Sequence, residues 1–170
     1  MKLQHKDLID LLKKAYSGEK AAALAYSGHA ASLKDQTEKA KIKQIEIDEW
    51  NHRHEIFQIM EKYEIEASKY YEFRSYIIGQ IICLSCYFIG RFMPFYFAGK
   101  LESQNVGEYL KMKEYFNQLD IQEHNNLLLN LSQKEKDHEN YLLERIKNHK
   151  FLPIFEKIFN WGSISAVSEL

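Results

Sequence analysis

The sequence predicts an all-α protein, a bundle of long helices. Two prolines and seven glycines are the only strong helix breakers among 170 residues. Apolar residues also recur every three to four positions along four long segments, as expected when one face of a helix packs against its neighbours. This length suits one domain with a substantial core, so we predict a single domain over residues 1–170.

Four long helices are predicted at about residues 6–33, 36–63, 88–117 and 121–149, and a short amphipathic helix at 154–161. Asp35 with Glu38, and Asp120 with Glu123, have the spacing of capping boxes, in which side chains satisfy the first backbone N–H groups of a helix. These two pairs are predicted to open the second and the fourth helix.

Six polar residues interrupt the apolar faces of the four long helices. They are Glu19, Glu49, His52, Glu102, Glu135 and His138. On the second helix, for example, the apolar stripe passes from Ile45 through Glu49 and His52 to Ile56. A buried carboxylate without a partner is costly, so four of them in one core require compensating positive charge. Two divalent metal ions would supply it.

The spacing of the four glutamates predicts how the helices are connected. Glu19 and Glu49 are 30 residues apart, and Glu102 and Glu135 are 33 apart. In each pair, the residue halfway between the two glutamates lies next to a predicted turn. The two glutamates are therefore expected to face each other at the same height of an antiparallel helical hairpin. The 50 residues from His52 to Glu102 then require one long crossover, as in ferritin-like four-helix bundles. Exposed Glu and His residues are the alternative interpretation, but exposed residues need not follow an apolar stripe.

Four short motifs resemble those of one family of di-iron proteins. They are Gly18-Glu19 with Tyr26, Asp48-Glu49-Trp50-Asn51-His52, Leu101-Glu102 with Tyr109, and Glu135-Lys136-Asp137-His138. On these motifs the chain resembles the demethoxyubiquinone hydroxylase family of ferritin-like proteins from about residue 16 to residue 161. The chain departs from the family at Ser103, where an acidic residue is usual, and at Glu108, where a histidine is usual. These departures concern the organic substrate, because all six ligand positions are present.

Four carboxylates and two neutral imidazoles match the charge of two Fe²⁺ ions, and their hard O and N donors suit iron or manganese. Glu19, Glu49 and His52 are assigned mainly to one metal ion, and the other three residues to the second. The resemblance implies that Glu49 and Glu135 bridge the two ions. It also implies a monooxygenase of ubiquinone biosynthesis, which uses O₂ and an external reductant to hydroxylate a quinone-type ring.

Three further residues are candidates for supporting the metal site. Asp48 is the expected hydrogen-bond partner of His138 across the bundle, with Asp137 as a weaker candidate. Tyr26 and Tyr109 lie two turns from Glu19 and Glu102, respectively, on the same stripes. These tyrosines would either position substrate and mediate electron transfer, or serve as aromatic core with a satisfied hydroxyl group.

Residues 76–101 form the most apolar segment, with Arg91 and Lys100 as its only charged residues. Its length suggests a transmembrane helix. Gln80, Arg91 and Pro94 argue against one, so we predict a crossover that meets a membrane interface or encloses an apolar substrate. An ordinary buried crossover is the alternative. Because no signal peptide is visible, we expect an intracellular protein, cytoplasmic or peripheral on the inner face of the membrane.

Two other functions remain open on the sequence. A ferritin-like or rubrerythrin-like oxidase or peroxidase would use the same ligands on Fe²⁺ or peroxide. A non-catalytic, membrane-associated helical scaffold would bind no iron. The net charge of −1, with acidic and basic residues interspersed, argues against a nucleic-acid partner. A hydrophobic quinone-like molecule, a membrane surface and a second copy of the chain are the candidate partners.

Overall fold

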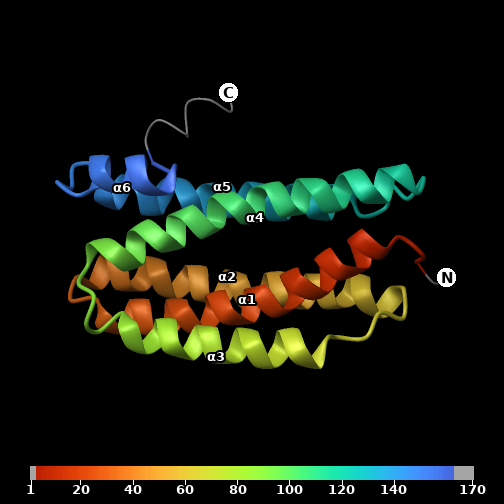
Figure 1. The fold of residues 1–170 in the computed structure, drawn as a ribbon, viewed down its shortest axis with the longest axis horizontal. Helices are drawn as coiled ribbons and strands as arrows, with labels where there is room; N and C mark the ends of the chain where they lie inside the picture. Colours follow the sequence, from red (N-terminus) through yellow and green to blue (C-terminus); the bar gives the residue numbers. More distant parts are fainter. Residues whose placement is uncertain (1–2, 163–170) are drawn as a thin grey trace.

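The computed structural model describes residues 3–162, and this part of the chain is all-helical, as predicted. Its six helices are α1 (Lys6–Ser32), α2 (Gln36–Lys62), α3 (Lys69–Ser85), α4 (Phe92–Gln118), α5 (Asn125–Ile146) and α6 (Leu152–Phe159). In Figure 1, α1 and α2 form one antiparallel hairpin and α4 and α5 form another, and the two hairpins lie side by side. The connection between them, residues 63–91, contains α3, which packs along α1.

The apolar segment 76–101 is divided between two helices, so the helix predicted at 88–117 begins only at Phe92. The chain turns over residues 86–91, where Gly90 adopts a φ of 75° that favours glycine. Pro94 lies in the first turn of α4, where its missing N–H group has no intrahelical acceptor to lose. A single long apolar helix is thereby excluded for this segment.

One of the two predicted helix caps is correct. Asp35 is the N-cap of α2, and its carboxylate accepts a hydrogen bond from the Glu38 backbone N–H at 2.8 Å. The cap predicted at Asp120 is wrong, because Asp120 has a φ of 58° and its N–H donates to the Asn117 carbonyl. It therefore belongs to the turn after α4. The helix predicted at 121–149 begins later, at Asn125, and ends at Ile146.

The core consists of two apolar clusters at opposite ends of the helices. One contains Leu8, Leu12, Ile56, Ile59, Met112, Phe116, Leu128 and Leu131, and the other contains Tyr26, Ile42, Ile45, Phe95, Tyr96, Leu142 and Ile146. On each of the four long helices, the six predicted ligand positions fall between the residues of these two clusters. The acidic residues are therefore shielded from water from both ends of the bundle.

Gly28 allows α1 and α3 to approach closely, because a Cβ atom at this position would overlap the backbone carbonyl group of Cys83. We expect Gly28→Ala to lower the free energy of unfolding by about 1–3 kcal/mol, since backbone must shift to admit the methyl group. Gly107→Ala is the matched control, as its Cβ would meet nothing within 4 Å. That change should raise stability by about 0.5–1 kcal/mol. Urea denaturation of both variants measures the two changes in the free energy of unfolding. Equal changes would contradict the close approach of α1 and α3 at Gly28.

Candidate metal centre

The six predicted ligand residues come together in the interior of the bundle. Glu19 is on α1, Glu49 and His52 on α2, Glu102 on α4, and Glu135 and His138 on α5. All six are buried, and none exposes more than 4% of its surface. Each of the six residues occupies a core-facing position on an otherwise apolar helix face. The antiparallel packing of the four long helices then brings the six side chains to the same level of the bundle.

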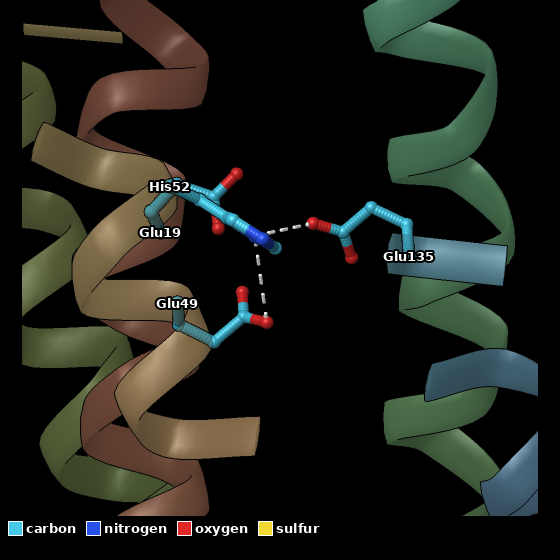
Figure 2. Close-up of side chains that lie close together, drawn as sticks. All are labelled: Glu19, Glu49, His52 and Glu135. Atoms are coloured by element: carbon cyan, nitrogen blue, oxygen red, sulfur yellow. Dashed lines mark ion pairs between the residues drawn. The ribbon is translucent and has the colours of Figure 1, made fainter. Parts of the chain in front are cut away.

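The donor atoms form two overlapping groups that could each hold a metal ion. In each group, one donor atom from every residue lies within 4.8 Å of the others. The groups are Glu19, Glu49, His52 and Glu135, and Glu49, Glu102, Glu135 and His138. Figure 2 shows the first group, with Glu135 reaching across the bundle toward His52 and Glu49. Glu49 and Glu135 belong to both groups, so they occupy the positions of ligands shared by two ions.

Seven donor atoms of this cluster are buried without a hydrogen-bond partner. They are Oε2 of Glu19, both oxygens of Glu49, Nδ1 of His52, Oε2 of Glu102, Oε1 of Glu135 and Nδ1 of His138. Buried polar atoms are nearly always paired in folded proteins, so this many in one place call for a ligand. Because each of the six residues contributes at least one such atom, two cations, one in each group, would give every residue a partner.

Both histidines present Nδ1 to the shared carboxylates. His52 Nδ1 lies 2.9 Å from Glu135 Oε1 and 3.9 Å from Glu49 Oε1 (Figure 2). The 2.9 Å contact is close, yet neither His52 Nδ1 nor Glu135 Oε1 makes a hydrogen bond. His138 Nδ1 lies 3.3 Å from Glu49 Oε1. These two nitrogens are therefore the metal-facing atoms of the imidazoles.

Asp48 makes the predicted contact with His138, at 3.1 Å from its Nε2. Burial would raise the pKa of Asp48, but hydrogen bonds from Gln44 and His138 outweigh it and the pKa is lowered. An ionised Asp48 can only accept, so Nε2 of His138 carries the proton and Nδ1 keeps its lone pair. Burial lowers the pKa of His138 to about 4, which keeps the ring neutral. Asp137, the weaker candidate, instead accepts from Gln133 on its own helix.

Tyr26 and Tyr109 bind the two outer carboxylates crosswise. The Tyr26 hydroxyl group on α1 donates to Oε1 of Glu102 on α4, and the Tyr109 hydroxyl group on α4 donates to Oε1 of Glu19 on α1. Burial, and then the neighbouring carboxylates, raise the pKa of both tyrosines well above its usual value, so both stay protonated donors. Each outer glutamate thus keeps one oxygen fixed and the other, Oε2, free for a metal ion.

Burial makes the carboxylates hard to ionise together. It raises the pKa of Glu49 and of Glu102 well above the usual value, and the nearby Glu135 raises both further. Burial also raises the pKa of Glu135 to about 8. Without a cation, the cluster therefore takes up protons at neutral pH, and a metal ion would displace them.

Two neighbouring cavities lie between α1, α3 and α4. One, of about 390 Å³, reaches Glu19 and Tyr109 and is bounded on α1 mainly by small residues such as Gly18 and Ala22. The other, of about 330 Å³, reaches Tyr26, and none of its described lining residues is charged. Ala22, Ala25, Ile82 and Leu101 border both cavities. An apolar molecule therefore has space beside the acidic cluster.

The structure also places residues that sequence reasoning missed or misplaced. Asn105, one turn after Glu102, donates to Oε2 of Glu135 at 3.5 Å, and its position on the ligand face of α4 was the available signal. The remaining histidines fall off the apolar stripes or near helix ends, which predicts surface positions, but His29 and His124 are buried. His29 packs edge-on against Phe95, and His124 contacts the hydroxyl group of Tyr63. Periodicity was the available signal for His29, which continues the register of Ala22 and Tyr26 on α1, whereas no local pattern marks the contact of His124.

We expect Asp48→Ala to weaken metal binding about 10- to 100-fold, because His138 loses the acceptor that holds its ring and tautomer. Asp137→Ala removes an exposed acid of the neighbouring helix and should leave the affinity unchanged. Titration of each metal-free variant with Fe²⁺ under anaerobic conditions, followed by calorimetry, compares them. Equal affinities in the two variants would show that Asp48 does not support the site.

Comparison of the chain with family models, with curated proteins and with solved structures found no match. The function of this cluster therefore has to be inferred from the chemistry of its own residues.

Proposed function

We propose that this protein is a di-iron monooxygenase that hydroxylates an uncharged, quinone-type aromatic ring. The observation that carries the proposal is the convergence of four glutamates and two histidines whose buried donor atoms lack partners. This ligand set is the one found in di-iron carboxylate bundles. The cavities beside it, with largely apolar walls, support an organic substrate.

The residues fit two divalent ions in charge and in donor type. Four carboxylates balance two Fe²⁺ or Mn²⁺ ions, and oxygen and imidazole donors suit both metals. Glu19 and His52 would hold one ion, Glu102 and His138 the other, and Glu49 and Glu135 would serve both. Two bound ferrous ions would supply the electrons and the binding site for O₂ reduction, and an external reductant would restore them.

The chain itself would prepare and protect this chemistry. Tyr26 and Tyr109 fix the outer carboxylates, and Asp48 fixes the His138 ring, so the donor atoms are oriented before a metal ion arrives. The two apolar clusters exclude water from both ends of the site. The cavity that reaches Glu19 would hold the ring of the substrate next to the metal ions.

The cavity lining favours this function over an iron-oxidising or peroxide-consuming one. Lys14 and Arg74 border the cavity that reaches Glu19, with Glu108 as the additional acid. A route for incoming Fe²⁺ ions would be expected to carry mainly acidic residues. The surrounding alanines and isoleucines suit an apolar ring instead.

Metal stoichiometry on protein loaded anaerobically with Fe²⁺ is the first test. Close to two irons per chain is expected, and a value near zero would reject the metal centre and favour a non-catalytic scaffold. The loaded protein is then given a soluble quinone, a chemical reductant and ¹⁸O₂. Mass spectrometry should detect one ¹⁸O atom in the product, and reoxidised iron without labelled product would favour the oxidase.

The side chains on the outer surface of α3 support binding of the protein to a membrane surface. The apolar side chains at 70, 73, 76, 77, 81 and 84 are all exposed on α3, and none of them lines the two cavities. Its only acid, Glu72, turns inward to Arg53 and Lys20, whereas Lys69 and Arg74 are exposed. An interfacial helix has these features. Over residues 3–162, none of the helices has the length and hydropathy needed to span a bilayer.

We expect the protein to float with vesicles that contain anionic lipid. Ile81→Lys should reduce the bound fraction about tenfold or more, because a cation replaces an apolar side chain that is 62% exposed. Leu129→Lys, at an exposed position of α5, is the control and should float like the unmodified protein. Flotation that is equal in both variants would assign membrane binding to another surface.

A further inference from the structure

The outward face of α2 carries a second apolar stripe, which the metal centre does not use. Ile47, Trp50 and Phe57 are 45%, 41% and 40% exposed. Together with exposed polar residues they form the series Lys43, Ile47, Trp50, His54, Phe57 and Glu61. Its steps alternate between four and three residues, which is the repeat of a coiled-coil seam. The buried ligands Glu49 and His52 lie on the opposite face of the helix.

Two copies of this stripe complement each other when they run antiparallel. With the two-fold axis level with residue 52, the facing pairs are Lys43 with Glu61, Ile47 with Phe57, and Trp50 with His54 of the second copy. Opposite charges then meet at both ends of the seam, and apolar or aromatic side chains meet between them. In a parallel arrangement Lys43 would face Lys43 and Glu61 would face Glu61, so like charges would oppose that alternative.

The residues that flank the stripe are compatible with a close partner. On one side the next positions are Gln44, Asn51 and Gln58, which are exposed and uncharged. In an antiparallel pair these amides face one another, so no repulsion arises along that edge. On the other side Arg53 already pairs with Glu72 of its own chain, at 2.9 Å. Its charge is therefore satisfied without a partner.

We propose that α2 forms the interface of a homodimer, with the two α2 helices antiparallel and packed through this stripe. The partner is a second copy of the chain, because the stripe complements itself in charge and in spacing. The dimer leaves the two cavities open, since no residue of α2 lines either of them. This inference goes beyond the proposed function and does not depend on metal binding.

Sedimentation of the full metal-free chain over a range of concentrations tests the interface. A dimer is expected, and Trp50→Lys should raise its dissociation constant at least tenfold, because a central aromatic residue is replaced by a charge. Ile81→Lys, at an exposed apolar position of α3, is the matched control and should leave the constant unchanged. A monomer at all concentrations, or a dimer disrupted by Ile81→Lys and not by Trp50→Lys, would overturn the proposal.

Charge reversal tests the antiparallel register and does not rely on the tryptophan variant. Lys43→Glu and Glu61→Lys should each weaken the dimer several-fold, and the double variant should restore it. Restoration cannot arise within one chain, because the two positions are about 27 Å apart along α2. Circular dichroism confirms that each variant is folded, since Lys43 also pairs with Glu46 of its own chain. If the double variant is as weak as the single ones, the antiparallel register is wrong.

Discussion

Anaerobic addition of Fe²⁺ is expected to raise the melting temperature of this protein by about 8–16 °C for each ion bound. An ion present at about 1,000 times its dissociation constant stabilises the folded state by about 4 kcal/mol. For a chain of this size, each kcal/mol corresponds to about 2–4 °C. The physical reason is that the ion binds only where Glu19, Glu49, Glu102 and Glu135 are held together, which the unfolded chain does not do.

The control for this measurement is a pair of variants on α5. Glu135→Gln keeps the size of a shared ligand but removes its charge, so the thermal shift should be lost or greatly reduced. Glu144→Gln changes an exposed position of the same helix and should retain the full shift. If the unmodified protein melts at the same temperature with and without Fe²⁺, the six buried residues do not form a metal centre.

The metal-free protein is expected to lose stability as the pH rises from about 6.5 to 8. The pKa of Glu135 is about 8 in the folded protein and near its ordinary value of 4.5 in the unfolded chain. The unfolded chain has already released this proton at pH 6.5, whereas the folded protein still holds it over most of the interval up to pH 8, so each rise in pH favours the unfolded chain. One proton over this interval corresponds to a loss of about 2 kcal/mol.

Histidines oppose this loss only weakly, and only in the lower part of the chosen interval. The pKa values of His29 and His138 are lowered to about 4 by burial, so both rings are neutral in the folded protein above that pH. In the unfolded chain their pKa is near 6.5, so each releases its remaining half proton between pH 6.5 and about 7.5, which offsets the loss by about 0.4 kcal/mol per histidine. Above about pH 7.5 the buried carboxylates decide how stability changes with pH.

Glu135→Gln should therefore raise the stability of the metal-free protein at pH 8 by about 2 kcal/mol or more, while it removes metal binding. Urea denaturation at pH 6.5 and pH 8, with a chelator present, measures both the slope and the gain. Glu144→Gln should follow the slope of the unmodified protein, because its side chain is exposed and its ion pair with Lys147 lies at the surface. A Glu135→Gln variant that is less stable than the unmodified protein at pH 8 would show that Glu135 is not an uncompensated acid in the metal-free state.

The positions of the six candidate ligands followed from helical periodicity, because a charged residue on an otherwise apolar stripe must face the core. Glu49 and His52, three residues apart on α2, illustrate this, and the hairpin spacing brought Glu102 and Glu135 to the same level. The contact between Asp48 and His138 was also foreseen and is present. The assignment of these residues to iron remains a prediction that metal loading will test.

Other features were settled only by contacts between helices that are distant in the sequence. The crosswise hydrogen bonds of Tyr26 and Tyr109 join α1 to α4, and no local pattern specifies which carboxylate each hydroxyl group meets. The break at 86–91 was missed because composition alone cannot locate a turn within an apolar segment. The helix cap predicted at Asp120 was wrong, because this residue has a left-handed backbone conformation in the turn after α4.

The sequence by itself determined that the chain is all-helical, that its helices form two hairpins, and that four glutamates and two histidines face a shared interior. These properties depend on the period of the helix and on residue spacing, which are local quantities. The tertiary structure decided which ring nitrogens and oxygens meet, where cavities open between α1, α3 and α4, and which apolar faces, on α2 and α3, remain uncovered. Those properties depend on how separate helices are rotated and placed against one another, and periodicity carries no information about that.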